Sequence, residues 1–314
     1  MIQIEEQKLI YGLPPSFIDL TSLDDSVGLS LNGVATTDVS GWSVASAGDL
    51  NSDGVDDFVI GAPGSDAAGT DSGASYVVFG SAQSLPSQIE LSSLDGITGF
   101  VLNGERPGDL SGWSVAAAGD VNADGIDDLI VGAPSGGRVR LEYGKSFVVF
   151  GSSTAFESAI NLSALDGTRG FALNGEVAGG RSGHAVAAAG DVNGDGIDDL
   201  IVGAPASDPF PDQRGGTSDI VGKSYVVFGS SNAFAAEIDL SSLNGISGFE
   251  LSGSTGDLSG LSVSSAGDMN GDGIDDLIVG APFGGANGGS SGVSYVVFGS
   301  RDGFASQIEL SSLD

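Results

Sequence analysis

The sequence predicts an all-β fold, a β-propeller built from four-stranded blades, on the basis of three observations. An acidic nine-residue segment occurs four times, at separations of 71, 71 and 77 residues, and begins at Asp49, Asp120, Asp191 and Asp268. Each copy is followed by the same short apolar runs and glycine-rich turns. No segment of about ten residues shows the 3.6-residue spacing of an amphipathic helix. A repeat made of four short strands is typical of a propeller blade.

The composition fits this fold and limits the partners. Of 314 residues, 53 are glycine and 40% are hydrophobic, as expected for short strands joined by tight turns. The 42 acidic and 10 basic residues give a formal net charge of −32, which argues against nucleic acid as a partner because phosphate binding needs basic residues. Without cysteine, neither disulfides nor thiolate metal ligands are available. Cations are therefore the natural counterpart.

The sequence contains no membrane or export signal. No apolar run reaches the roughly 18 residues of a membrane span, and the N-terminal stretch MIQIEEQKLIYGLPPS lacks the apolar core of a signal peptide. We therefore expect a soluble chain that does not insert into a membrane, with any export signal lying outside it.

The repeats set the expected domain organisation. Residues 1–314 are expected to form one propeller domain or a segment of a propeller, with residues 17–33 supplying an additional outer strand. The longest interval between repeats reflects an insertion at residues 207–223. The four units have the approximate bounds 34–104, 105–175, 176–253 and 254–314.

Four strand signals follow one another within each unit. The first, Trp42 to Ala47 in the first copy, is rich in small residues and suits a crowded position near the axis. The second, DFVIGAP or DLIVGAP, and the third, SYVVFG or SFVVFG, are apolar runs that we expect to be buried on both faces. The fourth, such as GFVLNG at residues 99–104, is more polar and is expected at the outer rim, after a linker of the type IELSSLDGI.

The acidic segment has the residue types and spacing of a calcium-binding loop. Ca²⁺ takes about six to eight oxygen ligands, which alternate residues of a tight loop can turn toward one centre. In the first copy, Asp49, Asn51 and Asp53 occupy positions one, three and five, and Gly54 permits the sharp turn. The carbonyl of Val55 and the carboxylate of position nine, Asp57, would complete the ligand set.

The other copies supply the same ligands, which predicts about four Ca²⁺ ions per chain. The EF-hand pattern does not fit, because its position twelve is acidic, whereas here position twelve lies in the apolar strand, as at Ile60. An ordinary Asp-Gly hairpin turn is the alternative, but four loops of uncompensated carboxylates would repel themselves. The remaining predicted ligands are Asp120, Asn122, Asp124, Ile126, Asp128, Asp191, Asn193, Asp195, Ile197, Asp199, Asp268, Asn270, Asp272, Ile274 and Asp276.

Position eight of the loop is also always aspartate. We expect these side chains to hydrogen-bond the loop or to face water rather than to bind the cation. They are Asp56, Asp127, Asp198 and Asp275.

These units resemble FG-GAP repeats, which build the β-propeller of integrin α subunits and of related surface proteins. The resemblance covers roughly residues 28–310 and rests on Asp-x-Asn-x-Asp-Gly-x-x-Asp, a Gly-Ala-Pro strand and an aromatic-Gly ending, four times in phase. It implies a calcium-binding module for adhesion or protein–protein interaction, located outside the cell or at its surface. The family usually has seven repeats, so the chain is either a four-blade ring or a segment of a longer propeller.

Ligand recognition is expected on the loops between the second and third strands, because these loops vary most between copies. They should emerge with the inter-blade connections on the face opposite the acidic loops. The partner there is a protein or, in the lectin alternative, a glycan. The most distinctive residues are Arg138, Arg140, Glu142 and Tyr143, for which a solvated charged loop is the simpler interpretation.

We expect no catalytic activity from this chain. The single histidine, His184, occupies the repeat position of Trp42 and is interpreted as a packing or rim residue. The loop carboxylates are assigned to cations, which leaves no acid/base pair in distinct environments. An accessory domain of a larger secreted enzyme is a further alternative.

The chain ends predict an open arrangement. A linker sequence occurs both at residues 17–25 and at residues 307–314, and a closed four-blade ring has room for one of them. This favours a segment of a longer array, whose open strand edges would lead to self-association.

Overall fold

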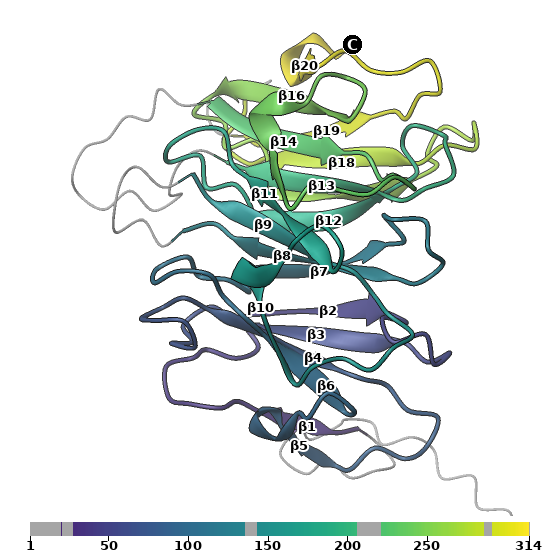
Figure 1. The fold of residues 1–314 in the computed structure, drawn as a ribbon. Coiled ribbons are helices and arrows are strands. Elements are labelled where there is room, and N and C mark those ends of the chain that lie inside the picture. The colour runs from purple at the N-terminus through teal and green to yellow at the C-terminus, as the bar shows by residue number, and fades with distance from the viewer. Residues whose placement is uncertain (1–19, 21–27, 136–142, 206–220, 286–290, 314) are drawn as a thin grey trace, which may run out of the picture.

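The computed structural model describes residues 20, 28–135, 143–205, 221–285 and 291–313. Over these residues the chain has the expected all-β fold, with one sheet for each repeat. Figure 1 shows the sheets stacked in chain order from the N-terminal to the C-terminal end. The sheets are called blades 1 to 4 below.

Each of the first three blades has four strands in the predicted order, with every strand antiparallel to its neighbours. Blade 4 has three strands among the described residues. The blades comprise β2 (Ser43–Gly48), β3 (Asp57–Ala62), β4 (Ala74–Val78) and β6 (Gly99–Asn103); β7 (Ser114–Gly119), β8 (Asp128–Ala133), β9 (Lys145–Val149) and β11 (Gly170–Asn174); β12 (Ala185–Gly190), β13 (Asp199–Ala204), β14 (Val221–Val227) and β16 (Gly248–Thr255); and β17 (Ser262–Gly267), β18 (Asp276–Ala281) and β19 (Val293–Val297).

The linkers add a strand that the sequence did not lead us to expect. Each linker forms a three-residue strand followed by one 3₁₀ turn, and it pairs in parallel with the outer strand of the blade before its own. In these strands only the middle side chain is buried or half-buried, and the two on either side are exposed. These strands are β5 (Gln88–Glu90), β10 (Ala159–Asn161), β15 (Glu237–Asp239) and β20 (Gln307–Glu309).

The linkers also carry an aromatic residue that packs onto the preceding blade. Phe156, just before β10, stacks on Phe100 of β6 with ring centroids 4.5 Å apart. The same stack recurs between Phe171 and Phe234 at 4.4 Å and between Phe249 and Phe304 at 4.2 Å. Each linker therefore fastens its repeat to the previous one through backbone pairing and a ring stack.

The hydrophobic core lies between blades. In one continuous cluster, Val59 and Val77 of blade 1 face Val115, Leu129 and Val131 of blade 2, and equivalent clusters join the later blades. The second and third strands are buried on both faces in the inner blades, as their unbroken apolar sequences predict. A blade is therefore stabilised by its neighbours more than by its own interior.

The two ends of the stack remain open among the described residues. The predicted outer strand within residues 17–33 appears as β1 (Ser30–Asn32), which pairs with β5 as β6 pairs with β10. Residues 17–19 and 21–27 lie outside the described part. No pairing joins β1 to β19 in the described chain, so the structure does not show a closed ring.

Candidate functional site

The four acidic loops occupy one face of the stack. Each loop joins the inner strand of a blade to the second strand, so equivalent connections place all four at the same strand ends (Figure 1). A β-bulge precedes each loop, at Gly48 in blade 1, where the backbone has a φ of +68°. This conformation favours glycine, and the bulge bends the strand so that the chain turns into the loop.

Positions one, three and five gather around one turn. In the first loop the amide of Asp53 donates to Asp49 Oδ1 and to Asn51 Oδ1, both at 2.9 Å. The amide of Gly54 donates to Asp49 Oδ2 at 2.8 Å, and that of Val55 to Asp53 Oδ1 at 2.9 Å. The same bonds recur in the other three loops. The side-chain oxygens of positions one and three therefore converge on a shared amide.

Position six has the left-handed backbone that the sequence predicts for its glycine, with φ of +88° at Gly54. Position four is left-handed as well, although it is Ser52 in the first loop and Ala123 in the second, with φ of 58° and 59°. A residue with a Cβ carries a small strain there, which the glycines of the third and fourth loops avoid.

Position nine is buried behind the loop. Asp128 is fully buried and accepts hydrogen bonds from the amides of Val121 at 3.0 Å and Gly151 at 2.9 Å. Burial raises the pKa of Asp128 to about 8; these hydrogen bonds oppose the shift, and the nearby charges of Asp124 and Asp120 add to it. The pKa is likewise raised to about 8 at Asp199 and to about 6 at Asp57.

Position seven contributes packing through its side chain. A Cβ built on Gly151, at the end of the third strand, would lie 2.6 Å from Ile126 Cγ2, and the equivalent glycines meet Val55, Ile197 and Ile274 in the same way. The apolar side chain therefore points away from the loop centre, and the backbone carbonyl is the atom that position seven can offer a cation.

The donor set fits a hard cation in its chemistry. Every predicted side-chain donor is a carboxylate or amide oxygen, which Ca²⁺ prefers. Within the described chain, however, no three acidic or histidine side chains converge closely enough to form a metal centre by themselves. The position-nine carboxylate is instead engaged by two amides. The ligand roles of the loop residues therefore stay predictions.

Position eight connects neighbouring loops. The amide of Asp49 donates to Asp127 Oδ2 at 2.9 Å, and the same bond joins the second loop to Asp198 and the third to Asp275. The position-eight side chain thus hydrogen-bonds a loop, as expected, but the loop is that of the preceding blade. Asp56, which has no preceding blade among the described residues, is exposed.

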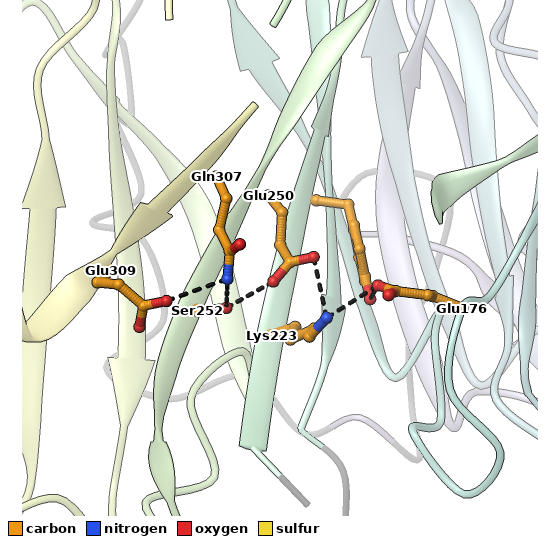
Figure 2. A network of polar contacts seen from close by, with 7 residues as sticks. Glu176, Lys223, Glu250, Ser252, Gln307 and Glu309 are labelled. Atoms are coloured by element: carbon orange, nitrogen blue, oxygen red, sulfur yellow. Dashed lines mark hydrogen bonds and ion pairs between the residues drawn. The ribbon is translucent and has the colours of Figure 1, made fainter. Parts of the chain in front are cut away.

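A second polar cluster was not predicted from the sequence. Figure 2 shows Lys223 of β14 between Glu176, which follows β11, and Glu250 of β16, with Nζ to Oε2 distances of 2.9 Å to both. The hydroxyl of Tyr225 donates to Glu176 Oε2 at 2.8 Å. Ser252 extends the cluster from Glu250 toward β20 through Gln307 and Glu309.

Comparing the repeats would have revealed this cluster. Lys145 and Glu105 form the equivalent pair in blade 2, at 2.7 Å. In blades 1 and 4 neither partner is present, because the lysine position holds Ala74 or Val293 and the glutamate position holds Val34 or Ser254. Loss of both partners together is what a partly buried pair favours, since one unpaired charge would be costly there.

The face opposite the acidic loops carries exposed apolar side chains. Val39, Trp42, Tyr143 and Phe283 are 45–53% exposed and lie in connections at that end of the strands. At the blade 1 end of the stack, a hollow of about 450 Å³ lies between the β1–β5 sheet and blade 1, lined by residues that include Ser65, Asp38 and Tyr76. Arg138, Arg140 and Glu142 lie outside the described residues.

His184 packs as its repeat position predicts. Its ring lies 5.7 Å from that of Trp113, which lies 4.7 Å from that of Trp42, so each of three successive blades adds one ring to a row. Among the described residues no helix is long and apolar enough to cross a bilayer.

The fold and the loops define a tandem-repeat protein built from propeller-type blades, each with one acidic loop. The FG-GAP repeat model matches residues 40–78, 111–149, 182–226 and 259–297. The chain therefore belongs to the FG-GAP repeat family, as its sequence motifs indicate.

The chain is similar to parts of much longer proteins. It is 37% identical over 182 residues to a phosphatidylinositol-glycan-specific phospholipase D of Bos taurus, covering 56% of this chain and 20% of that protein. It is 35% identical over 203 residues to integrin alpha pat-2 of Caenorhabditis elegans, covering 62% of this chain and 14% of that protein. It is 30% identical over 247 residues to integrin alpha-5 of Xenopus laevis, covering 77% of this chain and 20% of that protein. The chain thus spans a fifth or less of these relatives.

Proposed function

We propose that the chain is a calcium-stabilised recognition module that binds a protein ligand through the face opposite its acidic loops. The observation that carries this proposal is the fourfold repetition of one loop, with the same oxygen donors around the same turn, on a single face. The connections between the second and third strands differ most in sequence between repeats, and the strand ends that flank them lie on the opposite face. Constant loops on one side and variable loops on the other suit a rigid frame that presents a binding surface.

Calcium would stabilise the acidic loops and, through them, the blades. A cation held by positions one, three, five, seven and nine offsets the mutual repulsion of carboxylates that otherwise face one another within each loop. Cytosolic free calcium would leave sites of the extracellular type largely empty, so we place the module outside the cell or at its surface.

The exposed apolar side chains support recognition on the opposite face. Trp42 and Tyr143 are each 51% exposed and Phe283 is 45% exposed. Aromatic side chains of this kind are enriched at the centres of protein interfaces, where they bury large areas at low entropic cost.

The test is a binding screen with matched variants. The wild-type chain, a Trp42→Ser/Tyr143→Ser/Phe283→Ser variant and an Ile97→Ser/Ile246→Ser control are applied to immobilised extracellular-matrix proteins and to a glycan array. Ile97 and Ile246 are 79% and 85% exposed but belong to the linkers. Binding of protein that is lost in the triple variant and kept in the control supports the proposal. Binding to glycans alone would support the lectin alternative, and equal loss in both variants would mean non-specific adhesion.

The similarity to phosphatidylinositol-glycan-specific phospholipase D favours a second candidate, an accessory domain beside a catalytic one. In either case we infer that this chain does not itself catalyse. The loop carboxylates accept hydrogen bonds from backbone amides, and the ring of His184 packs against that of Trp113, so these groups have structural roles. The isolated chain should release no product from a phosphatidylinositol-glycan substrate, and turnover that His184→Ala abolishes would contradict this.

A further inference from the structure

A basic side chain lies between the third and fourth acidic loops. Arg301 follows the third strand of blade 4, and its Nη2 donates a hydrogen bond at 3.3 Å to the carbonyl of Gly273, which holds position six of the fourth loop. The stem of the same side chain lies beside Gly194, which holds position four of the third loop. One arginine therefore contacts both loops.

Both contacted glycines are themselves bonded to a predicted calcium ligand. The amide of Gly194 donates to Asp191 Oδ1 at 2.8 Å, and the amide of Gly273 donates to Asp268 Oδ2 at 2.9 Å. Asp191 and Asp268 hold position one of their loops. In each loop, a single glycine therefore separates the arginine side chain from the first carboxylate that the loop would offer to a cation.

The third loop leaves room for the arginine. A Cβ built on Gly194 would lie 2.5 Å from Arg301 Cγ, so a residue with a Cβ at this position would displace the arginine side chain. In the first and second loops, position four holds Ser52 and Ala123, which do carry a Cβ. The glycine of the third loop therefore permits the contact with Arg301.

The turn that carries the arginine contacts the preceding loop in every one of blades 2 to 4. The amide of Ser300 donates to the carbonyl of Val192 in the third loop at 2.9 Å, and equivalent bonds join the turns of blades 2 and 3 to the first and second loops. The residue after this serine is Arg301 in blade 4, but it is Ser153 in blade 2 and Ser231 in blade 3. The positive charge is thus added at one junction to a contact that all three share.

The charge of Arg301 is not cancelled by one close carboxylate. Within the part of the chain that the structure describes, the side chain forms no ion pair, and its hydrogen bond goes to a backbone carbonyl. Four other basic side chains pair with glutamates outside the acidic loops, and they are Arg106, Lys145, Arg169 and Lys223. The positive charge of Arg301 therefore acts at longer range on the carboxylates of both loops.

We propose that Arg301 lowers the calcium affinity of the third and fourth loops by acting as a built-in cation between them. The proposal rests on the calcium binding proposed above for these loops. Without calcium, the arginine charge offsets the repulsion among the carboxylates of the two loops, and with calcium bound it repels the ion. The junction of blades 3 and 4 should therefore depend less on calcium than the other two junctions.

The test compares calcium affinity in two matched backgrounds of the full chain. Asp53→Asn/Asp124→Asn leaves the third and fourth loops intact, and Asp195→Asn/Asp272→Asn leaves the first and second loops intact. Arg301→Ser installs the residue of the other junctions. It should lower the Kd for calcium about two- to fourfold in the first background, as expected for one unit charge near an exposed site, and leave the Kd of the second background unchanged. Isothermal titration of chelator-treated protein gives each Kd.

Two control variants and a second measurement separate charge from structure. Arg301→Lys keeps the charge and should keep most of the wild-type Kd. Arg106→Ser removes a charge from the connection between β6 and β7, on the face opposite the loops, and should change neither Kd. Arg301→Ser should lower the melting temperature in excess chelator, and this loss should disappear in saturating calcium. A purely structural arginine would give the same loss in both conditions.

Three results would overturn the proposal. The first is a Kd that Arg301→Ser leaves unchanged in the first background, and the second is an equal gain in both backgrounds, which would assign the effect to net charge alone. The third is an Arg301→Lys variant that behaves as Arg301→Ser does. If the wild type binds no calcium, the proposed function fails together with this proposal. If the wild type binds calcium and Arg301→Ser has no effect, only this proposal fails.

Discussion

Asp127 Oδ2 accepts a hydrogen bond from the backbone amide of Asp49 at 2.9 Å, which joins the first acidic loop to the second. The contact is close enough that a Cβ on Gly48 would lie 2.6 Å from Asp127 Cβ. Glycine at this bulge is thus required both by its positive φ and by the approach of the neighbouring blade. The acidic loops are therefore coupled through the position-eight carboxylates.

Removing this link should cost stability only where a preceding blade is present. We expect Asp127→Ala to lower the free energy of unfolding by about 1.5–3 kcal/mol, the usual range for a hydrogen bond to a charged group. Asp56→Ala, at the equivalent exposed position, should change it by less than about 0.5 kcal/mol. Urea unfolding in chelator, where cation binding is absent, measures both. Equal losses would mean that position eight does not act through the preceding loop.

Positions five and nine should respond differently to calcium. Asp195→Ala should lower the melting temperature in calcium and change it much less in excess chelator, because its carboxylate is a predicted ligand at an exposed loop. Asp199→Ala should be destabilising in both conditions, since it also removes the acceptor for the amides of Val192 and Gly229. Thermal unfolding with and without chelator separates the two. An Asp195→Ala loss that is the same in both conditions would contradict a metal role.

The Glu176 cluster should give a pH-dependent contribution. Burial alone would raise the pKa of Glu176, but hydrogen bonds from Lys223 and Tyr225 outweigh it and hold the pKa below its ordinary value of 4.5. The ionised form therefore stabilises the fold above about pH 4.5, and this stabilisation is lost as the pH falls through the folded-state pKa. Glu176→Gln should cost roughly 1 kcal/mol at pH 7 and progressively less below pH 4.5.

The control for this experiment is Glu157→Gln. Glu157 pairs with Arg169 at 3.2 Å, but both side chains are at least half exposed, so its removal should have little effect at any pH. Chemical unfolding at a series of pH values gives the comparison. A Glu176→Gln effect that does not shrink at low pH would assign it to packing instead of charge.

The blade strands could be predicted because each has a local signal. The runs DLIVGA and SYVVF are apolar throughout, and the Gly-Ala-Pro and aromatic-Gly endings mark where they stop. The left-handed conformation of the glycine at position six of the acidic loop was predictable for the same reason, since the motif that marks it lies within the loop itself.

Contacts between repeats were not predictable in this way. The linker strand β10 is three residues long and pairs with β6, about 58 residues earlier, so no local pattern marks it. The partner of Asp127 lies 78 residues away in sequence. The register between neighbouring blades decides both contacts, and only the structure supplies that register. The differences between repeats mark Lys223 and Glu176 as a pair of residues that occur together. They do not show that the two side chains meet across neighbouring blades.

Counting the calcium bound per chain tests the central claim most directly. Equilibrium dialysis of chelator-treated protein should give about four Ca²⁺ per chain, with Kd on the order of 10⁻⁴ to 10⁻³ M. A variant with asparagine at position five of every loop, replacing Asp53, Asp124, Asp195 and Asp272, keeps most of the net negative charge and should lose this binding. If the wild type binds no more calcium than this variant at millimolar concentrations, the account is contradicted.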